Sequence, residues 1–454
     1  MTRRRLLAPT LAACALVASA ATAAAAQPTD STPGPPAAGP TDSRTPSYYD
    51  VTLDATHTSA GLIAQGADVS EGSRPGQAVV VATPEQAGRL RTAGYRLTYT
   101  ASLYAQQPQA RTSLADGTYY GGYHTVAAHE QHVADVAAAH PDLATATTVG
   151  QSWLKQQGRG GHDIKAICIT KKAEGDCDGK SDGKPKFTMM AQIHARELAT
   201  GELAWKWIDT LVGDYGKDDA ITKLMDTTEL WVIPIANPDG VDVVASNPDE
   251  PLWQRKNVND VDTADCSKED QGIDLNRNAD VSWNNPDQGG PCDETFSGKA
   301  AASEPELQGL QGFFSTLYAD KRANDWTSPA DPDTTGTFIT LHSYGNYVIY
   351  PWGHTNDASP DKAKLKAIGD KYAASNGYQV GTAGETVGYL APGGTEDWLY
   401  YDRGVPGVTF EVGGDGGDCG GFFPAYSCMD DFWAKNKPAF ITAGQLAAKP
   451  YAVG

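Results

Sequence analysis

Six short apolar runs, separated by stretches with helical patterns, constrain the fold of this chain most. They are Ile164–Ile169, Phe187–Ile193, Leu230–Ile235, Thr337–Leu341, Tyr347–Tyr350 and Gly407–Val412. Continuous apolar runs of this length are typical of strands that are buried on both faces. Because helical patterns lie between them, we predict an α/β protein with a central mixed, mainly parallel twisted sheet covered by helices on both faces. The chain has 454 residues and is 40% hydrophobic, which is enough for such a core.

The N-terminus is typical of a secretory signal peptide. Three arginines, Arg3–Arg5, precede an uncharged, alanine-rich stretch that ends in small residues near Ala26. The alternative is a membrane anchor, which is disfavoured because alanine contributes little transfer free energy. We therefore predict that residues 1–26 are a signal peptide and that the protein is secreted, extracellular and without a membrane anchor. The arginines also loosely fit a twin-arginine signal, so the export route stays open.

A linker and a small module are predicted to follow. Residues 27–47 are rich in Pro, Ser and Thr and have no apolar periodicity, which indicates a linker. Strand patterns then appear in residues 49–53 and 77–82, and a helix is predicted to begin after Thr83. A small α/β module with a polar exit is typical of a propeptide with its processing linker, which we place at residues 48–116. A plain accessory domain is the alternative.

The net charge and the cysteine content indicate which class of partner is unfavourable and in which compartment the protein is expected. The formal net charge of −20 makes nucleic acid an unfavourable partner. The cysteines that remain once Cys14 leaves with the signal are even in number, which predicts disulfides in a secreted chain. Short separations favour two pairs and leave a third, namely Cys168–Cys177, Cys419–Cys428 and Cys266–Cys292. A cysteine zinc site is the alternative, but the sequence contains no CxxC pair.

A histidine and a glutamate three residues apart stand immediately after the second apolar run. Their spacing predicts that His194 and Glu197 lie on one face of a helical turn. Zinc binds an imidazole nitrogen and a carboxylate oxygen, and a catalytic site needs a third protein ligand and an open position for water. On its own this pattern also fits the start of a surface helix.

Further motifs occur along the chain in a fixed order. They are Ile235–Gly240, Trp253–Lys256, Gly272–Asn278, Pro291–Phe296, Leu341–Gly345, Tyr389–Trp398 and Val408–Val412. With His194–Glu197, they resemble the motifs of zinc carboxypeptidases of the carboxypeptidase A/B type, including bacterial carboxypeptidase T-like enzymes secreted as proenzymes. The resemblance extends from about Tyr119 to the C-terminus. It implies the carboxypeptidase fold, a catalytic domain over residues 117–454, a Cys266–Cys292 disulfide and one Zn²⁺ per chain.

The resemblance also implies the metal ligands and the groups around them. His194, Glu197 and His342 are expected to bind zinc, and Asp274 is expected to orient His194. A ligating histidine needs such a hydrogen-bond acceptor because the imidazole must be held in one tautomer.

Two further residues are expected to carry the chemistry. Glu411 is the predicted general base, because a carboxylate inside an apolar strand is costly to bury unless it serves a partner. Arg255 is the predicted cation for the oxyanion of the tetrahedral intermediate. Gln254 separates Trp253 from this arginine, unlike the commonest pattern in the family, so Lys256 is the alternative.

Substrate recognition is expected from four residues. Asn276 and Arg277 match the clamp for the terminal carboxylate, and Tyr389 matches the tyrosine that closes over it. Glu396 stands where family members that release basic residues carry an acid. We therefore predict a preference for C-terminal Lys or Arg, with dual basic and hydrophobic specificity as the alternative.

Together these features predict a secreted, monomeric, zinc-dependent carboxypeptidase that acts on peptide or protein C-termini. One alternative is a catalytically inactive peptide-binding relative, which is disfavoured because every expected catalytic residue is present. Another is a cell-wall or structural interaction module, which is disfavoured because repeats and a sorting tail are missing from the sequence. A hydrolase of cell-wall or isopeptide-linked amino acids is the third.

Overall fold

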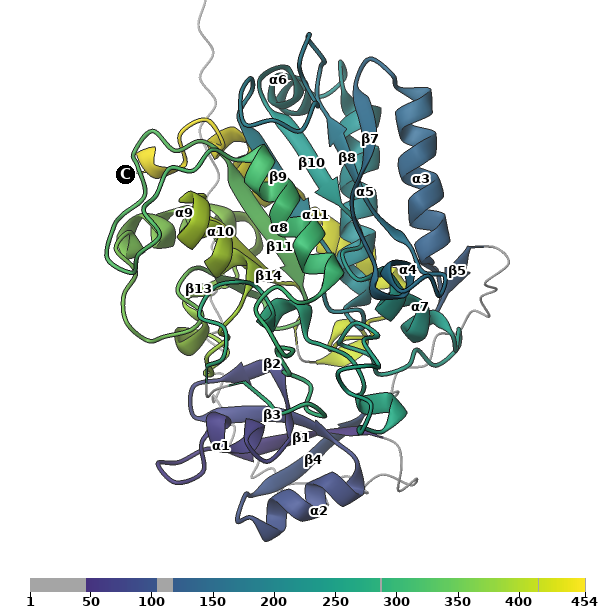
Figure 1. The fold of residues 1–454 in the computed structure, drawn as a ribbon, viewed down its shortest axis with the longest axis vertical. Helices are drawn as coiled ribbons and strands as arrows, with labels where there is room; N and C mark the ends of the chain where they lie inside the picture. The colour runs from purple at the N-terminus through teal and green to yellow at the C-terminus, as the bar shows by residue number, and fades with distance from the viewer. Residues whose placement is uncertain (1–45, 104–116, 286–287, 415, 454) are drawn as a thin grey trace, which may run out of the picture. The chain divides into compact units, whose positions relative to one another are not determined.

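The computed structural model describes residues 46–103, 117–285, 288–414 and 416–453. The predicted signal peptide, nearly all of the predicted linker and the polar segment 106–116 lie outside these residues. A four-stranded sheet lies near the N-terminus, and an eight-stranded sheet forms the centre of the remaining chain (Figure 1). Among the described residues, the helices are all too short or too polar to cross a membrane.

The N-terminal module is a small antiparallel sheet with two helices. Its strands, in spatial order, are β2 (Asp68–Arg74), β3 (Gln77–Ala82), β1 (Ser47–Thr52) and β4 (Leu97–Ser102). Its helices are α1 (Ser59–Ile63) and α2 (Pro84–Thr92). A capping box starts α2, because the Thr83 side chain accepts from the backbone N–H of Gln86 and the Gln86 side chain accepts from that of Thr83. Apolar residues of the sheet and both helices form one cluster.

The large sheet combines parallel and antiparallel pairs. Its strands, in spatial order, are β13 (Gln379–Gly381), β12 (Tyr347–Ile349), β14 (Gly407–Glu411), β11 (Thr337–His342), β9 (Lys186–Met190), β10 (Glu229–Ile233), β8 (Asp163–Ile169) and β7 (Ala144–Gln151). The four central strands are parallel to one another, as are β12 and β13. The other neighbours pair antiparallel. The predicted mixed, mainly parallel sheet is confirmed.

Helices cover both faces of this sheet (Figure 1). They are α3 (Val126–Ala139), α4 (Trp153–Gln156), α5 (Leu198–Asp214), α6 (Asp219–Thr227), α7 (Pro238–Ala245), α8 (Pro305–Leu317), α9 (Lys362–Asn376), α10 (Thr395–Arg403) and α11 (Met429–Leu446). A two-stranded ribbon of β5 (Thr118–Tyr119) and β6 (Tyr123–His124) precedes α3.

Successive strand residues enter two different apolar cores. Met189 packs in a core with α3, α5, α9 and α11, whereas its neighbour Met190 packs in a second core with α8 and α10. Val232 and Trp231 divide between the two cores in the same way. Because side chains alternate across a strand, a strand with apolar residues at every position must be covered on both faces. This is why the continuous apolar runs predicted the layered fold.

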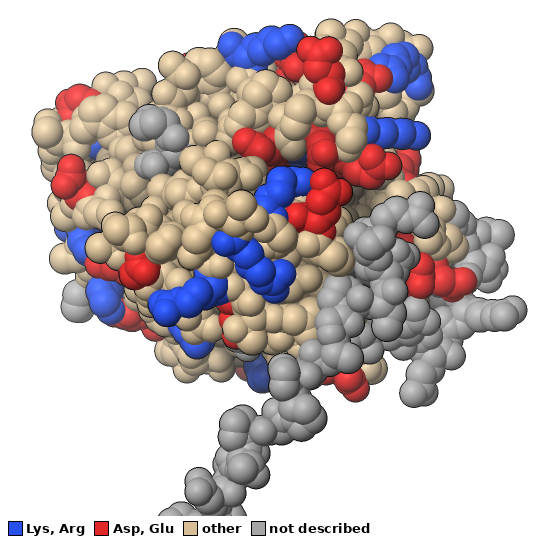
Figure 2. Space-filling model, turned by 90° about the horizontal axis from the view of Figure 1, so that it is seen from below, with Lys and Arg blue, Asp and Glu red and all other residues tan. Residues whose placement is uncertain are grey.

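Three disulfides join the pairs that the sequence favoured. They are Cys168–Cys177, Cys266–Cys292 and Cys419–Cys428. On the face shown in Figure 2, acidic and basic side chains lie among neutral ones. The net charge of −20 therefore does not form one continuous acidic surface on that face.

The central parallel strands place the key side chains at one edge of the sheet. His342 is the last residue of β11 and Glu411 is the last residue of β14, and the two are directly paired in register. His194 follows β9, the other neighbour of β11. The carboxyl ends of parallel strands are where α/β sheets build their sites.

Candidate metal centre and active site

Three buried side chains face one another at this edge. The possible ligand atoms of His194, Glu197 and His342 all lie within 4.8 Å of one another. His194 Nδ1 is 2.7 Å from Glu197 Oε1 and 3.1 Å from His342 Nδ1. Two imidazole nitrogens and a carboxylate that converge on one point form a metal-binding arrangement. This donor set fits one Zn²⁺ with a fourth coordination position left for water or substrate.

The first two of these residues do not lie in a helix, and this part of the prediction is wrong. They occupy a turn after β9 in which the Glu197 N–H donates to the His194 carbonyl at 3.3 Å. Helix α5 begins only at Leu198, with Glu197 in the N-cap position. The left-handed backbone of Gln192, with φ of 45°, bends the chain away from the strand direction. The turn brings both side chains to the same side, as a helical turn would.

The outward-facing histidine nitrogens have partners. His194 Nε2 lies 3.2 Å from Asp274 Oδ1, and His342 Nε2 lies 3.1 Å from Thr340 Oγ1. Such contacts set the tautomer and leave each Nδ1 free to face a metal. Burial, and then the positive charge of Arg255, lower the pKa of His342 to about 3. This histidine is therefore neutral, which is the form that binds metals.

Glu411 is buried beside this cluster. It is 4% exposed, and its Oε2 has no hydrogen-bond partner among the described residues. Burial, followed by the negative charges of Glu71 and Glu197, raises the pKa of Glu411 well above its usual value. A carboxylate with a raised pKa and a free oxygen can accept and release a proton.

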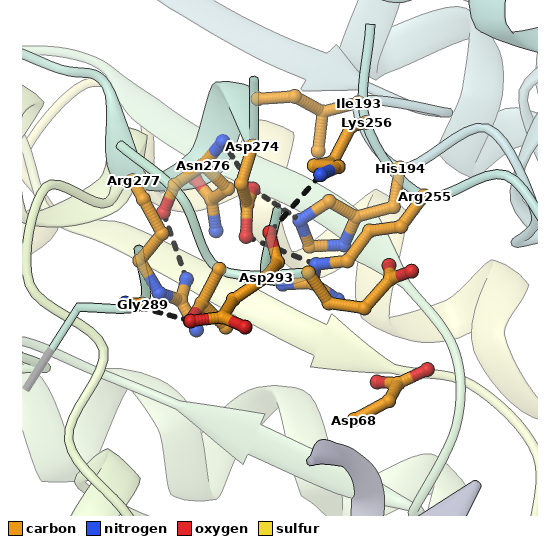
Figure 3. A network of polar contacts seen from close by, with 12 residues as sticks. Asp68, Ile193, His194, Arg255, Lys256, Asp274, Asn276, Arg277, Gly289 and Asp293 are labelled. Carbon is orange, nitrogen blue, oxygen red and sulfur yellow. Dashed lines mark hydrogen bonds and ion pairs between the residues drawn. The ribbon is translucent and has the colours of Figure 1, made fainter. Parts of the chain in front are cut away.

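Arg255 and Lys256 have different surroundings, which distinguishes the two candidates for the cationic role (Figure 3). Arg255 Nε donates to Asp274 Oδ2 at 2.9 Å, so the carboxylate that contacts His194 also holds this arginine. Lys256 Nζ instead donates to the carbonyl oxygens of Asp270 and Asp293. Arg255 therefore lies next to the cluster of His194, Glu197 and His342, whereas the ammonium group of Lys256 binds carbonyl oxygens of neighbouring loops.

The predicted carboxylate clamp follows Asp274 directly (Figure 3). Asn276 and Arg277 belong to a short 3-10 helix, η3 (Leu275–Arg277). The Asn276 N–H donates to Asp274 Oδ1 at 2.9 Å, and its side-chain oxygen accepts from the Thr395 N–H at 2.9 Å. Arg277 is 3% exposed, and its Nη1 donates to the Asn276 carbonyl at 2.8 Å. Asp274 thus contacts the candidate metal site through His194, the arginine Arg255, and the predicted clamp through Asn276.

Tyr389 lies in the same region but packs against the N-terminal module. It belongs to the apolar cluster that contains Val69 and Val80 of that module. A Cβ on the preceding Gly388 would lie 2.9 Å from the backbone carbon of Arg74, so only glycine fits between the two chain segments. Burial, and then the negative charge of Glu71, raise the pKa of Tyr389 well above its usual value.

Glu396 is the second residue of α10 and is also buried, with 4% of its surface exposed. Its Oε2 has no hydrogen-bond partner among the described residues. Two glycines flank its other oxygen: a Cβ at Gly394 would lie 2.6 Å from Oε1, and one at Gly353 would lie 3.6 Å from it. Burial, followed by the charge of Asp397, raises the pKa of Glu396 to about 7.

Two acidic residues of strand β2 reach these groups, and sequence reasoning missed both. Glu71 Oε1 accepts from Arg255 Nη1 at 2.6 Å, and Asp68 pairs with Arg196 at 2.7 Å. Burial raises the pKa of Glu71, but Arg255 and Arg196 outweigh it and the net shift is downward, so this carboxylate is charged. The sequence of β2 contains no motif, and these contacts join residues far apart in the chain. Only the three-residue spacing of the two acids was a usable signal.

Comparison with known proteins identifies the family. Residues 129–439 match the model of a protein family described as zinc carboxypeptidase. Carboxypeptidase A2 of Mus musculus is 28% identical over 310 residues, which are 67% of this chain and 64% of the mouse protein. Carboxypeptidase B of Canis lupus familiaris is 28% identical over 307 residues, which are 66% of this chain and 65% of the dog protein. The matched region thus spans just under two thirds of these two relatives.

A solved structure is also similar. The crystal structure of the carboxypeptidase A from Helicoverpa armigera covers 90% of this chain and 98% of its own, with a TM-score of 0.68 and 20% identity. At that identity the likeness establishes the carboxypeptidase fold. The family match covers well over half of the chain and includes all three residues of the candidate metal site. The protein therefore belongs to the zinc carboxypeptidase family.

Proposed function

We propose that this protein is a zinc-dependent carboxypeptidase that hydrolyses the last peptide bond of peptides or proteins. The observation that carries the proposal is the buried cluster in which His194, Glu197 and His342 face one point, with Glu411 and Arg255 beside it. Zinc bound there would polarise the scissile carbonyl and lower the pKa of a water molecule. The family match supports this metal.

The remaining chemistry is assigned to protein residues. Glu411 takes the proton of the attacking water and passes it to the nitrogen of the leaving amine, for which its free Oε2 and raised pKa are suited. Arg255 stabilises the negative charge that develops on the carbonyl oxygen. Asp274 holds Arg255 in place through its contact with Nε, so the terminal nitrogens of the guanidinium would face substrate once Glu71, which now accepts from Nη1, has left.

Recognition of the chain end is assigned to Asn276, Arg277 and Tyr389. A buried guanidinium can bind a carboxylate through two parallel hydrogen bonds, and Arg277 is buried with one side-chain hydrogen bond among the described residues, to the Asn276 carbonyl. Tyr389 closes over the bound terminus, and the glycine before it supplies the freedom for that movement. These roles explain why the enzyme would remove residues only from a free C-terminus.

For the released residue we propose a preference for Lys or Arg. Glu396 supports it, because a buried carboxylate with an unpartnered oxygen would pair with a substrate cation. The pKa of about 7 favours the alternative of dual specificity, because a protonated Glu396 tolerates an apolar side chain. The balance between the two therefore depends on pH.

We also propose that residues 48–116 are an inhibitory propeptide and residues 117–454 the catalytic domain. Strand β2 supports this, because Glu71 occupies the terminal nitrogen of Arg255 that the reaction needs. Ser70 Oγ donates to the Tyr344 hydroxyl at 2.9 Å. Tyr389 packs on the same module. In keeping with a proenzyme, we propose a secreted, extracellular monomer made with a signal peptide.

The decisive assay combines metal analysis with C-terminal release from a peptide library. Protein cleaved between residues 104 and 116 should carry one zinc per chain and release single C-terminal residues. A chelator should abolish the release, and added zinc should restore it. Zinc-loaded protein that releases nothing from any peptide would reject the proposal in favour of a binding role.

A further inference from the structure

Two neighbouring acids at the start of α10 have very different partners. Asp397 is fully buried, and its carboxylate accepts hydrogen bonds from the Gly353 N–H at 2.9 Å and from the His354 N–H at 3.2 Å. Glu396 is also buried, but its Oε2 has no hydrogen-bond partner among the described residues. Asp397 therefore fixes the loop that carries Gly353 and His354, whereas Glu396 keeps an oxygen available for substrate.

The side chain of His354 makes a further contact with Asp397. Its Nδ1 lies 2.9 Å from Asp397 Oδ2. Because a carboxylate oxygen can only accept, Nδ1 carries the hydrogen and donates it. The imidazole side chain is 12% exposed, and its ring packs against the exposed Trp326 with 4.6 Å between ring centres. His354 thus lies between solvent and a carboxylate that solvent does not reach, where it can exchange protons with water.

The charges of Asp397 and Glu396 influence each other. Both carboxylates approach the same point beside Gly353, because a Cβ there would lie 3.6 Å from Glu396 Oε1 and 3.7 Å from Asp397 Oδ2. Two like charges in a buried setting disfavour each other. Burial, followed by the charge of Asp397, raises the pKa of Glu396 to about 7. A positive charge on His354 would offset that of Asp397 and so favour the charged form of Glu396.

We propose that His354 is a positioning residue for specificity, which acts through Asp397 and sets how strongly Glu396 attracts a basic C-terminal residue. The inference deepens the proposed preference for Lys or Arg and rests on the proposed peptidase function. A protonated imidazole offsets the charge of Asp397 and keeps Glu396 charged, so that it binds a substrate cation. A neutral imidazole still donates its hydrogen bond but leaves the full charge of Asp397 beside Glu396.

Other charged groups around these residues come from η3, from the loop after α8 and from α10. Arg277 of η3 favours the charged form of Glu396. Arg322, in the loop after α8, packs against Tyr400 of α10, with its guanidinium carbon 4.8 Å from the ring centre. Both arginines keep their charge at any pH used here, and burial raises the pKa of Tyr400. Among these groups, His354 and Glu396 are the ones able to change charge near neutral pH.

The test measures the ratio of kcat/KM for peptides ending in Arg over peptides ending in Phe, at about pH 6 and about pH 8. The enzyme is the full chain, folded and then cleaved between residues 104 and 116. His354→Asn keeps a donor near the position of Nδ1 but cannot carry a charge. At about pH 6 its ratio should lie roughly three- to tenfold below wild type, because loss of a nearby positive charge lowers the charged fraction of Glu396.

Two further measurements separate the charge from the hydrogen bond. At about pH 8, where imidazoles are ordinarily neutral, the ratio in His354→Asn should match wild type. His354→Lys stays charged at both pH values and should restore the wild-type ratio at about pH 6. Because the ratio is internal to each variant, a loss of folded protein or zinc lowers both rates and does not change it.

A matched control is available in His132 of α3, whose Nε2 lies 2.7 Å from Asp209 Oδ1. Its side chain is 10% exposed and its ring stacks on Trp205, but α3 packs on β7 and β8, away from the strands that contact α10. His132→Asn should leave the ratio unchanged at both pH values.

Three results would overturn the role of His354. They are a wild-type ratio in His354→Asn at about pH 6, an equal loss at both pH values, as a purely structural role would give, and a ratio in His354→Lys as low as in His354→Asn. A wild-type enzyme that favours Arg over Phe at neither pH would instead reject the proposed specificity of Glu396. Failure to cleave any peptide would reject the proposed peptidase function.

Discussion

The edge of the large sheet and strand β2 of the N-terminal module bring charged groups to the same place, but they satisfy them differently. At the sheet edge, Asp274 contacts both His194 and Arg255, so these groups have partners within their own domain. Asp68 and Glu71 of β2 pair instead with arginines across the boundary. A buried charge needs a partner, and in the proposed proenzyme removal of the module would expose these arginines to substrate. We therefore propose that the sheet edge carries out the reaction and that strand β2 blocks it.

The largest expected effect tests the edge of the large sheet. In Glu411→Gln the side chain keeps its shape but cannot take up a proton, so kcat should fall by roughly 10²–10⁴-fold. Zinc content should be unchanged, because Glu411 is not among the three clustered ligands. Steady-state kinetics and metal analysis check this. Glu385→Gln, at an exposed glutamate paired with Lys362, is the control. A wild-type kcat in Glu411→Gln would remove this residue from the mechanism.

The second prediction concerns the specificity pocket. Glu396→Ile removes the only carboxylate proposed to meet a substrate cation, leaving that cation desolvated at a cost of roughly 2–5 kcal/mol. The kcat/KM ratio for peptides ending in Arg over those ending in Phe should reverse in favour of Phe. Four matched peptides, ending in Arg, Lys, Phe and Leu, measure this in wild type and variant. A wild type that already prefers Phe, or a variant with an unchanged ratio, would contradict the assignment.

The third prediction tests strand β2 of the N-terminal module. In the uncleaved chain, Glu71→Gln breaks the 2.6 Å pair with Arg255 and should raise activity roughly tenfold or more. Glu85→Gln, at an exposed glutamate of α2 in the same module, is the matched control and should do nothing. Uncleaved wild-type protein as active as the cleaved form would exclude inhibition by the module.

The smallest effect is a dependence of specificity on pH. The pKa of Glu396 is raised to about 7, so its carboxylate is mostly protonated below that pH and mostly charged above it. The ratio of kcat/KM for Arg-ending over Phe-ending peptides should therefore increase several-fold between about pH 6 and pH 8. Taking the ratio cancels the titration of Glu411, which affects both substrates. A ratio that is flat in wild type and in Glu396→Ile would place the group elsewhere.

The same contrast explains what could be predicted from the sequence. His194, His342 and Glu411 follow or end apolar strands, so their positions were readable from local patterns together with motif order. Strand β2 was not predicted, because Ser70, Glu71, Gly72 and Ser73 interrupt any apolar alternation. The guanidinium of Arg196 packs against the rings of Trp253 and Phe422, which are distant in sequence and meet only in the folded chain. Tertiary contacts of this kind leave no local signal.

The most direct test of the central claim compares one peptide in two forms, with a free C-terminal carboxylate and with a C-terminal amide. Cleaved, zinc-loaded protein is incubated with each, and the products are identified by mass spectrometry. The proposed clamp of Asn276 and Arg277 requires the carboxylate, so single residues should be released from the free peptide alone, and a chelator should stop the reaction. Equal cleavage of the amide, or cleavage at internal bonds, would contradict the account.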